Sequence, residues 1–402
     1  MYYRQPRYYS EFKCIGSGCN ANCCYGWNIE WSKEEIDKVK NAPNCSDKLK
    51  EILENHFNTE DNERISVKLL DDGKCPCQTE DGLCIIQQEL GAEYLSRTCT
   101  IYPRYFSHLS RNGAVYRGCN LTCKEIVRML VNDEKAAELV NVPTKDDLRG
   151  ERLTHGRTAG DVAAHPELKY QGDLFEFFYD LISDKKCSVE TNITVGALTA
   201  LKLADLIGNK EYDRIPEALG SFRKQVHNAA GLKAIDSMKI DYDVKLGIVD
   251  RINEKAVGFN MINVLKNPDG LYVVDRYLAG EARLNEMMKD KPFWLRNIAL
   301  NMIMELSVPF NSKDHSVFEN YRFFVAAFAC IKINAIAAAF ANQEEYLFRG
   351  SSFRFKGIDQ IYGLTGMISR SLFQGRNTFD NLNNALNEFK INSPVHLAML
   401  VK

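Results

Sequence analysis

The sequence has no excess of charge of either sign. Its 402 residues carry 51 Lys and Arg against 53 Asp and Glu, a formal net charge of −2. A protein that binds nucleic acid needs a basic excess to contact the phosphates, so this balance argues against that class. The 45% hydrophobic and 26% charged residues are typical of a soluble globular protein, and the length allows about two or three domains.

We expect neither a targeting segment nor a membrane-spanning segment from the sequence. The opening residues, MYYRQPRYYSEFK, are aromatic and basic but lack the apolar core of a secretory signal. The most apolar stretch, 323–341, is rich in alanine and contains Lys332 and Asn334, whereas a membrane span needs about 20 predominantly apolar residues. We therefore expect this stretch to form the central helix of a helical domain, and we expect a cytoplasmic protein without membrane partners.

Several common motifs do not occur. No strand leads into Gly-x-Gly-x-x-Gly, so the usual dinucleotide-type methyltransferase fold is not indicated. There is neither a pair of Cys-x2-Cys knuckles, which zinc ribbons favour, nor a Cys-x3-Cys-x2-Cys of the radical type. No repeat of fixed period is present.

What the sequence does contain is a concentration of cysteine. Of its 13 cysteines, all but Cys187 and Cys330 lie between residues 14 and 123. Disulfides do not persist in a reducing cytosol, where clustered thiols are more often metal ligands or redox groups. We interpret Cys187 and Cys330 as buried free thiols in apolar helices, and the roles of Cys45, Cys77 and Cys119 stay open.

The kinds of metal ligand in the first 125 residues limit which metal site the chain can form. The first 125 residues offer only two histidines, His56 and His108, so an all-thiolate site is indicated. The cysteine spacing is irregular, and Cys23 and Cys24 are adjacent. An iron–sulfur cube spreads its ligands more widely than one zinc ion, so we favour a [4Fe-4S] cluster, with zinc as the alternative.

Local signals predict a mainly α protein with a loop-rich cysteine domain followed by an all-helical domain. Ser32 and Glu35 form a capping-box pattern that starts a helix, a second helix covers 46–56, and "EDGLC" at 80–84 is a turn that delivers Cys84. Thr122 and Glu125 suggest another capping box, with Cys123 in the first turn of a helix over 123–140. Helices are expected at 168–183, 193–206, 211–226, 242–256, 272–288, 292–306, 316–342, 357–372, 378–389 and 394–401. The predicted division is a metal-binding domain at 1–125, a helix and polar linker at 126–166, and a helical domain at 167–402.

Three stretches carry a resemblance to a known family. "FKCIGSGCNANCCYGWNI", "CPCQTEDGLCIIQQELGAEYLSRTCTIYPR" and "LTCKEIVRMLV" resemble, in this order, blocks of the flagellin lysine-N-methylases, and "WLRNIALNMIMELSVPFNSKD" resembles their carboxy-terminal block. The chain departs from the pattern at Lys124, where proline is usual, in the additional thiols Cys77 and Cys119, and in lacking a histidine near 369. The cysteines that match are Cys14, Cys19, Cys23, Cys24, Cys75, Cys84, Cys99 and Cys123.

The resemblance implies methyl transfer from S-adenosylmethionine to lysine side chains of flagellin, with the cysteines binding an iron–sulfur cluster that is structural or catalytic. Arg104 is then a candidate to bind the carboxylate of S-adenosylmethionine as a bidentate fork, or else to pair with an acid or support the thiolates. Tyr102 is a candidate to orient the substrate amine, or else a packing residue. The alternatives in other classes are a non-enzymatic, metal-stabilised interaction module and an iron–sulfur redox protein.

Overall fold

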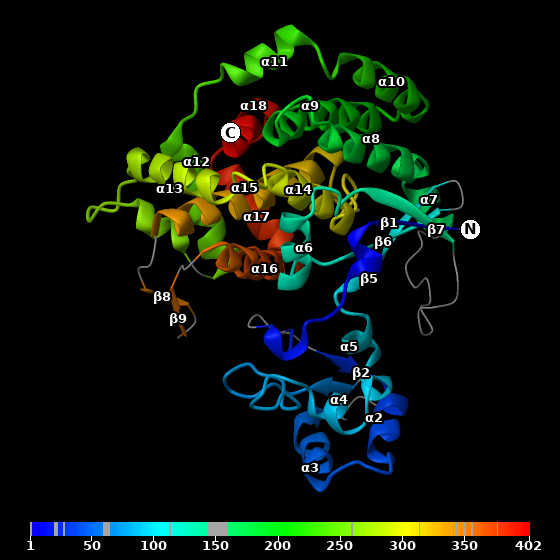
Figure 1. Ribbon diagram of the computed structural model, residues 1–402. Coiled ribbons are helices and arrows are strands. Elements are labelled where there is room, and N and C mark those ends of the chain that lie inside the picture. The colour runs from blue at the N-terminus through cyan, green and yellow to red at the C-terminus, as the bar shows by residue number, and fades with distance from the viewer. Residues whose placement is uncertain are drawn as a thin grey trace. The chain divides into compact units, whose positions relative to one another are not determined.

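A computed structural model describes the chain in two compact units, Phe12–Tyr105 and Met1–Glu11 with Phe106–Lys402 (Figure 1). The structure does not describe residues 1, 20–22, 27–28, 59–64, 112–113, 144–158, 259, 313, 342–344, 349–350, 355–356 and 376. It also leaves the side chains at 58, 108–111, 159–160, 229, 345–348 and 351–354 undescribed. Residues 1–11 and 106–125, which the sequence-based division places with the cysteines, fold with the helical part. Most of the polar linker that we expected at 141–166 falls outside the described residues.

The smaller unit is rich in loops, as the cysteine-rich sequence predicts. Its three short strands form a sheet in the order β2 (Glu30–Trp31), β4 (Ile65–Val67) and β3 (Phe57–Asn58). Its helices are α2 (Lys33–Lys40), α3 (Asp47–His56), α4 (Ile85–Glu89) and α5 (Arg97–Ile101), with 3₁₀ turns at Gly16–Gly18 and Ala92–Tyr94. Strand β5 (Arg104–Arg111) begins at the end of this segment and belongs mostly to the larger unit.

The local signals in this unit act as predicted. Ser32 Oγ accepts the Glu35 N–H at 3.2 Å while Glu35 Oε2 accepts the Ser32 N–H at 2.8 Å, so the capping box starts α2. Gly82 takes a φ of +76° in the turn before Cys84, a conformation that glycine adopts without strain. The core beneath contains Trp31, whose ring meets that of Phe57 edge-on at 5.6 Å.

A four-stranded sheet in the larger unit was not predicted. Its order is β5, β6 (Ala114–Cys119), β1 (Tyr2–Pro6) and β7 (Leu139–Pro143). Strand β1 pairs in parallel with β6, with Arg4 opposite Tyr116, and antiparallel with β7. Because its partners are more than 100 positions away in the sequence, no local pattern announces this pairing.

The helix that begins near Cys123 is shorter than predicted. Helix α6 covers Lys124–Asn132, Cys123 is its N-cap residue, and no side chain caps it, so the capping box expected from Thr122 does not form. Residues 139–143 are strand rather than helix because β7 pairs with β1. Glu125 instead binds Arg128, with Oε1 2.6 Å from Nη2.

The rest of the larger unit is helical, and the ten helices predicted from residue 167 onward are all present. They are α8 (Gln171–Ser183), α9 (Val189–Gly208), α10 (Ile215–Gln225), α12 (Tyr242–Ile252), α13 (Val274–Met287), α14 (Trp294–Glu305), α15 (Val317–Ala341), α16 (Ile358–Gln374), α17 (Thr378–Glu388) and α18 (Pro394–Val401). The structure adds α1 (Tyr8–Glu11), α7 (Ala159–Ala164), α11 (Ala229–Asp236) and a hairpin of β8 (Glu345–Phe348) and β9 (Ser351–Arg354). A mainly α fold is thus confirmed.

Helix α15 is the core of the helical part. It contacts α9, α13, α16 and α18 (Figure 1). By length and composition it could cross a membrane, but 94% of its most apolar window is buried inside the protein, as expected for a central helix. Its polar residues are paired: Lys332 Nζ donates to Glu190 Oε1 at 2.9 Å, and Asn334 hydrogen-bonds Asn253 at 3.0 Å.

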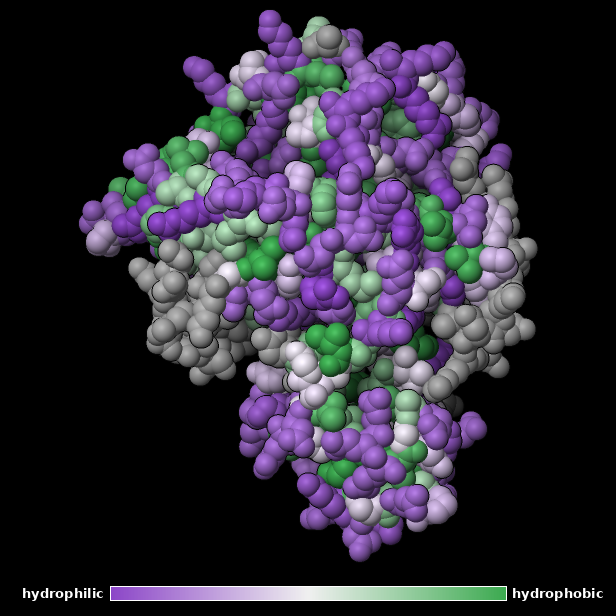
Figure 2. All heavy atoms as spheres, in the orientation of Figure 1, coloured by the Kyte–Doolittle hydropathy of each residue, from purple (hydrophilic) through white to green (hydrophobic). Residues whose placement is uncertain are grey.

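Two glycines let neighbouring helices approach α15 closely. A Cβ at Gly196 in α9 would lie 2.0 Å from the Tyr321 hydroxyl, and one at Gly280 in α13 would lie 2.5 Å from the Ile336 carbonyl oxygen. A larger residue at Gly196 would have to displace the Tyr321 ring, and one at Gly280 would have to move the backbone of α15. On the face that Figure 2 shows, hydrophilic side chains cover most of the described surface.

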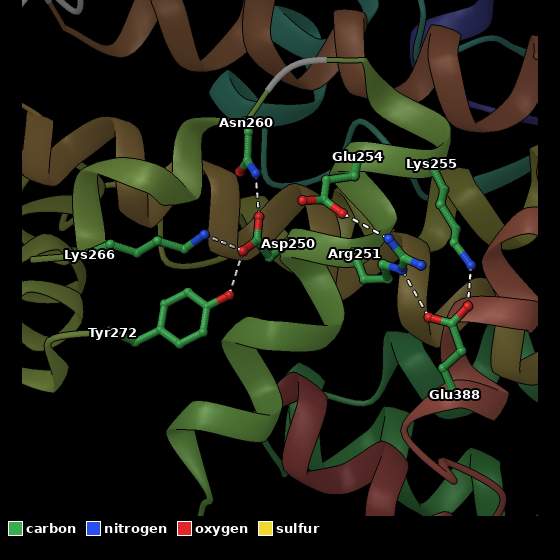
Figure 3. A network of polar contacts seen from close by, with 8 residues as sticks. All are labelled: Asp250, Arg251, Glu254, Lys255, Asn260, Lys266, Tyr272 and Glu388. Carbon is green, nitrogen blue, oxygen red and sulfur yellow. Dashed lines mark hydrogen bonds and ion pairs between the residues drawn. The ribbon is translucent and has the colours of Figure 1, made fainter. Parts of the chain in front are cut away.

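A polar network holds the segment that follows α12 (Figure 3). Asp250 is 8% exposed and accepts hydrogen bonds from Asn260, from Lys266 at 2.5 Å and from Tyr272 at 2.5 Å. A buried carboxylate is tolerated because three donors replace its water. Nearby, Glu388 of α17 accepts from Arg251 at 2.9 Å and from Lys255, at a more exposed position.

Candidate functional site

Backbone hydrogen bonds bring the cysteine segments of the smaller unit together. The Cys75 N–H donates to the Cys24 carbonyl oxygen at 2.8 Å, next to a bridge between Tyr25 and Lys74. The Ile85 N–H donates to the Cys77 carbonyl oxygen at 2.8 Å. The stretch at Cys24 and the two stretches at Cys75 and Cys84 therefore present their thiols in one region of the unit's core.

Six thiols lie close enough to influence one another. We call them the thiol group: Cys23, Cys24, Cys75, Cys77, Cys84 and Cys99. Burial raises the pKa values of Cys84 and Cys99, and the charges of Cys75 and Cys23 raise them further. A hydrogen bond with Cys75 and burial raise the pKa of Cys77, and the charges of Cys75, Cys84 and Cys99 add to that effect. These thiols therefore cannot all ionise together unless a cation compensates them.

Hydrogen bonds and burial decide which sulfur holds a proton. A hydrogen bond with Cys23, followed by burial, raises the pKa of Cys24. A hydrogen bond from Cys77 lowers the pKa of Cys75, and the same bond raises that of Cys77. Burial raises the pKa of Cys99 to about 12. The group thus holds shared protons that a metal would displace, since thiolates are the ligands.

Of the eight cysteines predicted as ligands, the structure places five in the thiol group. These are Cys23, Cys24, Cys75, Cys84 and Cys99, joined by Cys77, whose role the sequence left open. The exposed Cys14 sulfur accepts a hydrogen bond from the Gly16 N–H at 3.4 Å. Cys19 is half-buried at the end of the same turn. Cys123 belongs to the larger unit.

The thiol group is not arranged as a finished metal site. Among the described residues, no three His, Cys, Asp or Glu side chains converge tightly enough to hold a metal ion as they stand. The soft, all-sulfur donor set nevertheless fits the chemistry of iron–sulfur or zinc.

Tyr102 and Arg104 follow the last cysteine of the smaller unit. Tyr102 ends α5 and is half-buried. Arg104 Nη2 donates to the Phe12 carbonyl oxygen at 3.0 Å, and its guanidinium stacks 4.9 Å from the centre of the Phe12 ring. Part of the Arg104 side chain therefore holds the chain at Phe12.

In the larger unit, the segment Cys119–Cys123 is held from α1 and α14. The Tyr8 hydroxyl accepts the Cys119 N–H at 3.1 Å, and Asn301 Nδ2 donates to the Cys119 carbonyl oxygen at 3.1 Å. Glu305 Oε2 accepts the Leu121 N–H at 2.9 Å. Burial raises the pKa of Glu305 to about 8, against the opposing effect of that N–H.

Arg117 of β6 is a second charged residue that we did not single out from the sequence. It is 4% exposed, and its Nε donates to Gln5 Oε1 at 2.6 Å. Its Nη1 is buried and has no hydrogen-bond acceptor within the part of the chain that the structure describes. The sequence did contain a signal for each residue. Arg117 is a charged residue inside the short apolar run AVYRGC, and Glu305 is a charged residue at the end of an apolar helix.

Comparison with known proteins matches residues 175–400 to the family described as "FliB lysine N-methylase C-terminal domain". A stretch of 139 residues, 34% of this chain, is 31% identical to proteins named Lysine-N-methylase from Salmonella typhimurium and Salmonella choleraesuis, and covers 34% of each. A match of the same length is 30% identical to the Flagellar biosynthetic protein FliU of Salmonella muenchen and covers 80% of that protein.

The chain thus matches about a third of the length of the two relatives named Lysine-N-methylase. No solved structure matches it. The family match covers more than half of the 402 residues, and this chain therefore belongs to the FliB-like lysine N-methylase family.

Proposed function

We propose that this protein transfers methyl groups from S-adenosylmethionine to lysine side chains of flagellin in the cytoplasm. The observation that carries the proposal is the family match over 175–400. The relatives' names supply the reaction, lysine N-methylation, and a flagellar context. Flagellin is the substrate that we infer from that context.

The chemistry is a displacement at carbon. A lysine ammonium, whose ordinary pKa is about 10.4, must first lose a proton. The free amine then attacks the sulfonium methyl: a nitrogen–carbon bond forms, the sulfur–carbon bond breaks, and its electron pair stays on sulfur as S-adenosylhomocysteine. The protein has to remove water from the amine and hold it in line with the methyl group, because positioning supplies much of the rate.

We further propose that the thiol group binds a [4Fe-4S] cluster, with zinc as the alternative. A cube needs four cysteine ligands and the thiol group offers six sulfurs, while Cys14, Cys19 and Cys123 stay candidates for additional ligands. The mutual repulsion of the buried thiolates supports a bound cation at this place. When bound, the cluster would contribute folding free energy to a unit whose own core is small.

Tyr102 and Arg104 stay candidates for the amine and for the carboxylate of S-adenosylmethionine. Their position directly after Cys99 in the chain supports a role near the metal, and the contact of Arg104 with Phe12 supports a structural one. Substituting each residue in the assay below separates these roles, since a structural residue changes stability rather than the Michaelis constant for the cofactor.

Incubation of anaerobically purified protein with flagellin and S-adenosylmethionine bearing a labelled methyl group tests the proposal. We expect label on flagellin lysines, located by mass spectrometry, and none when the cofactor is omitted. A protein with an intact cluster that leaves flagellin unlabelled would contradict the proposal. A non-enzymatic module would also bind no cofactor, and a redox protein would show a reversible potential without methyl transfer.

A further inference from the structure

Arg117 lies on one defined face of the sheet in the larger unit. The parallel register that sets Arg4 opposite Tyr116 makes Gln5 the neighbour of Arg117. Because side chains alternate along a strand, Gln5 and Arg117 share one face while Arg4 and Tyr116 share the other. The Gln5–Arg117 hydrogen bond at 2.6 Å agrees with this assignment.

Two tyrosine rings enclose the Arg117 guanidinium. Its central carbon lies 3.8 Å from the centre of the Tyr3 ring and 4.4 Å from that of Tyr9. Stacking on aromatic faces fixes the plane of the guanidinium and directs its donors to the edge of that plane. The head group is therefore held in place before any ligand arrives.

The charge of Arg117 has no carboxylate partner among the described residues. Its donor Nε is used by Gln5, a neutral acceptor, and its buried Nη1 has no acceptor. Arg4, on the opposite face, shows the usual arrangement, with Nε 3.1 Å from the carboxylate of Glu176. Burying a charge without a counter-ion costs free energy. A buried guanidinium without a carboxylate partner therefore indicates that an anionic ligand binds there.

We propose that Arg117 binds the carboxylate of the methionyl end of S-adenosylmethionine. This inference rests on the proposed function and names a residue of its cofactor site. A carboxylate at the edge of the guanidinium accepts the unused Nη1 donor and neutralises the charge. Arg104, the candidate suggested by the sequence, already donates to a backbone carbonyl.

The position also suits the reaction. Cys119 follows Arg117 by two residues on the same strand and face, a distance of about 7 Å. The segment from Cys119 to Cys123 then passes Glu305, which binds the Leu121 N–H. A carboxylate bound at Arg117 would place the rest of the cofactor beside this segment and the carboxyl group of Glu305.

The test compares equilibrium binding of S-adenosylmethionine and of decarboxylated S-adenosylmethionine, which lacks only the carboxylate, to the anaerobically prepared full chain. We expect wild type to prefer S-adenosylmethionine by about 10- to 100-fold, the range for a charge-assisted hydrogen bond. Arg117→Gln should lose that preference, and Arg117→Lys should keep part of it. The matched control Arg4→Gln removes a charge from the other face and should keep the full preference.

Each other outcome overturns the inference in a recognisable way. If wild type binds the two compounds equally, or Arg117→Gln keeps the preference, Arg117 is not the anchor, while the proposed function stands. If Arg104→Gln alone abolishes the preference, the sequence-based candidate is the anchor instead. If wild type binds neither compound, the proposed function fails and this inference fails with it. The wild-type comparison holds even where a variant does not fold.

Discussion

The backbone N–H of Cys75 donates a 2.8 Å hydrogen bond to the carbonyl oxygen of Cys24. This contact joins the double-cysteine segment to the segment that contains Cys75 and Cys77, about 50 residues further along the chain. Because this hydrogen bond fixes the backbone at Cys24, the adjacent residues Cys23 and Cys24 are both held close to Cys75. The thiol group is thus a product of β-type pairing between loops rather than of a compact sequence motif.

Replacing Cys84 by serine should remove most of the bound metal. Cys84 belongs to the thiol group, and backbone N–H groups of Ile86 and Gln87 stabilise its thiolate. Because metal binding is also folding free energy, we expect the unfolding midpoint to fall by about 5 °C or more. Metal analysis and thermal unfolding of the purified variant measure both effects.

Cys330→Ser is the matched control for that variant. Cys330 is buried in α15, where its thiol donates to Asn253 Oδ1 at 3.3 Å, and a serine hydroxyl can make the same contact. Its metal content should equal that of wild type. Full metal occupancy in Cys84→Ser would remove Cys84 from the ligand set.

Asp250→Asn should destabilise the helical part by about 1–3 kcal/mol. The substitution removes the charge that three donors surround and leaves Lys266, whose Nζ lies 2.5 Å from Asp250, without its ion pair (Figure 3). Glu388→Gln, at an exposed pair, should destabilise the protein less than Asp250→Asn does, because water screens that pair. Urea unfolding of the two variants ranks them, and an equal loss would show that burial does not strengthen the Asp250 network.

Glu305 should make stability fall as pH rises. Burial raises its pKa to about 8 from an ordinary 4.5, so between these values the unfolded chain has released a proton that the folded chain keeps. Stability contributed by the neutral carboxyl is therefore lost through this window. Glu305→Gln retains an oxygen for the Leu121 N–H and cannot ionise. The free energy of unfolding of this variant, relative to that of wild type, should therefore increase between pH 5 and pH 8 by on the order of 2–4 kcal/mol. A pH-independent difference in urea unfolding would contradict the assignment.

Lys245 should act in the opposite direction. Burial, and then the charge of Lys332, lower its pKa to about 7 from an ordinary 10.5. Its Nζ donates to the Tyr277 hydroxyl at 2.9 Å. Between pH 7 and 10.5 the unfolded chain binds the additional proton, so stability rises with pH across this window.

Lys245→Met isolates that effect. The variant buries no ammonium, so its stability relative to wild type should be greatest near pH 7 and should decline by on the order of 2–4 kcal/mol towards pH 10. Chemical unfolding of both proteins at several pH values measures the difference. A constant difference would mean that Lys245 keeps its charge in the folded protein, in contact with water.

The helical part could be predicted from the sequence because its signals are local. Apolar residues recur at helical spacing, as in Leu174, Phe175, Phe178 and Ile182, all buried in α8. The capping box at Ser32 and the glycine turn at Gly82 are equally local. Lys332 and Asn334 correctly indicated a protein core rather than a lipid-facing helix, since both find polar partners.

The sheet and the site depend on contacts that cross the chain. Strand β1 gains its partners only when residues 114–116 and 139–143 reach it. Because residues 139–143 pair with β1 as a strand, they do not extend α6 as the sequence had predicted. Membership of Cys77 in the thiol group follows from its hydrogen bond with Cys75, whereas the sequence alone left the role of Cys77 open. Arg117 and Glu305 stand out only because of their surroundings in the folded protein, which the spacing of residues in the sequence does not reveal.

The central claim is that thiolates of the amino-terminal cysteines hold an inorganic cluster. Counting iron, acid-labile sulfide and zinc per chain in anaerobically purified protein, together with its visible absorption spectrum, tests this claim most directly. The account predicts a brown protein with equal iron and sulfide and a broad visible band, or, for the alternative metal, stoichiometric zinc. A well-folded preparation that contains neither iron nor zinc, or whose cysteines are joined as disulfides, would contradict it.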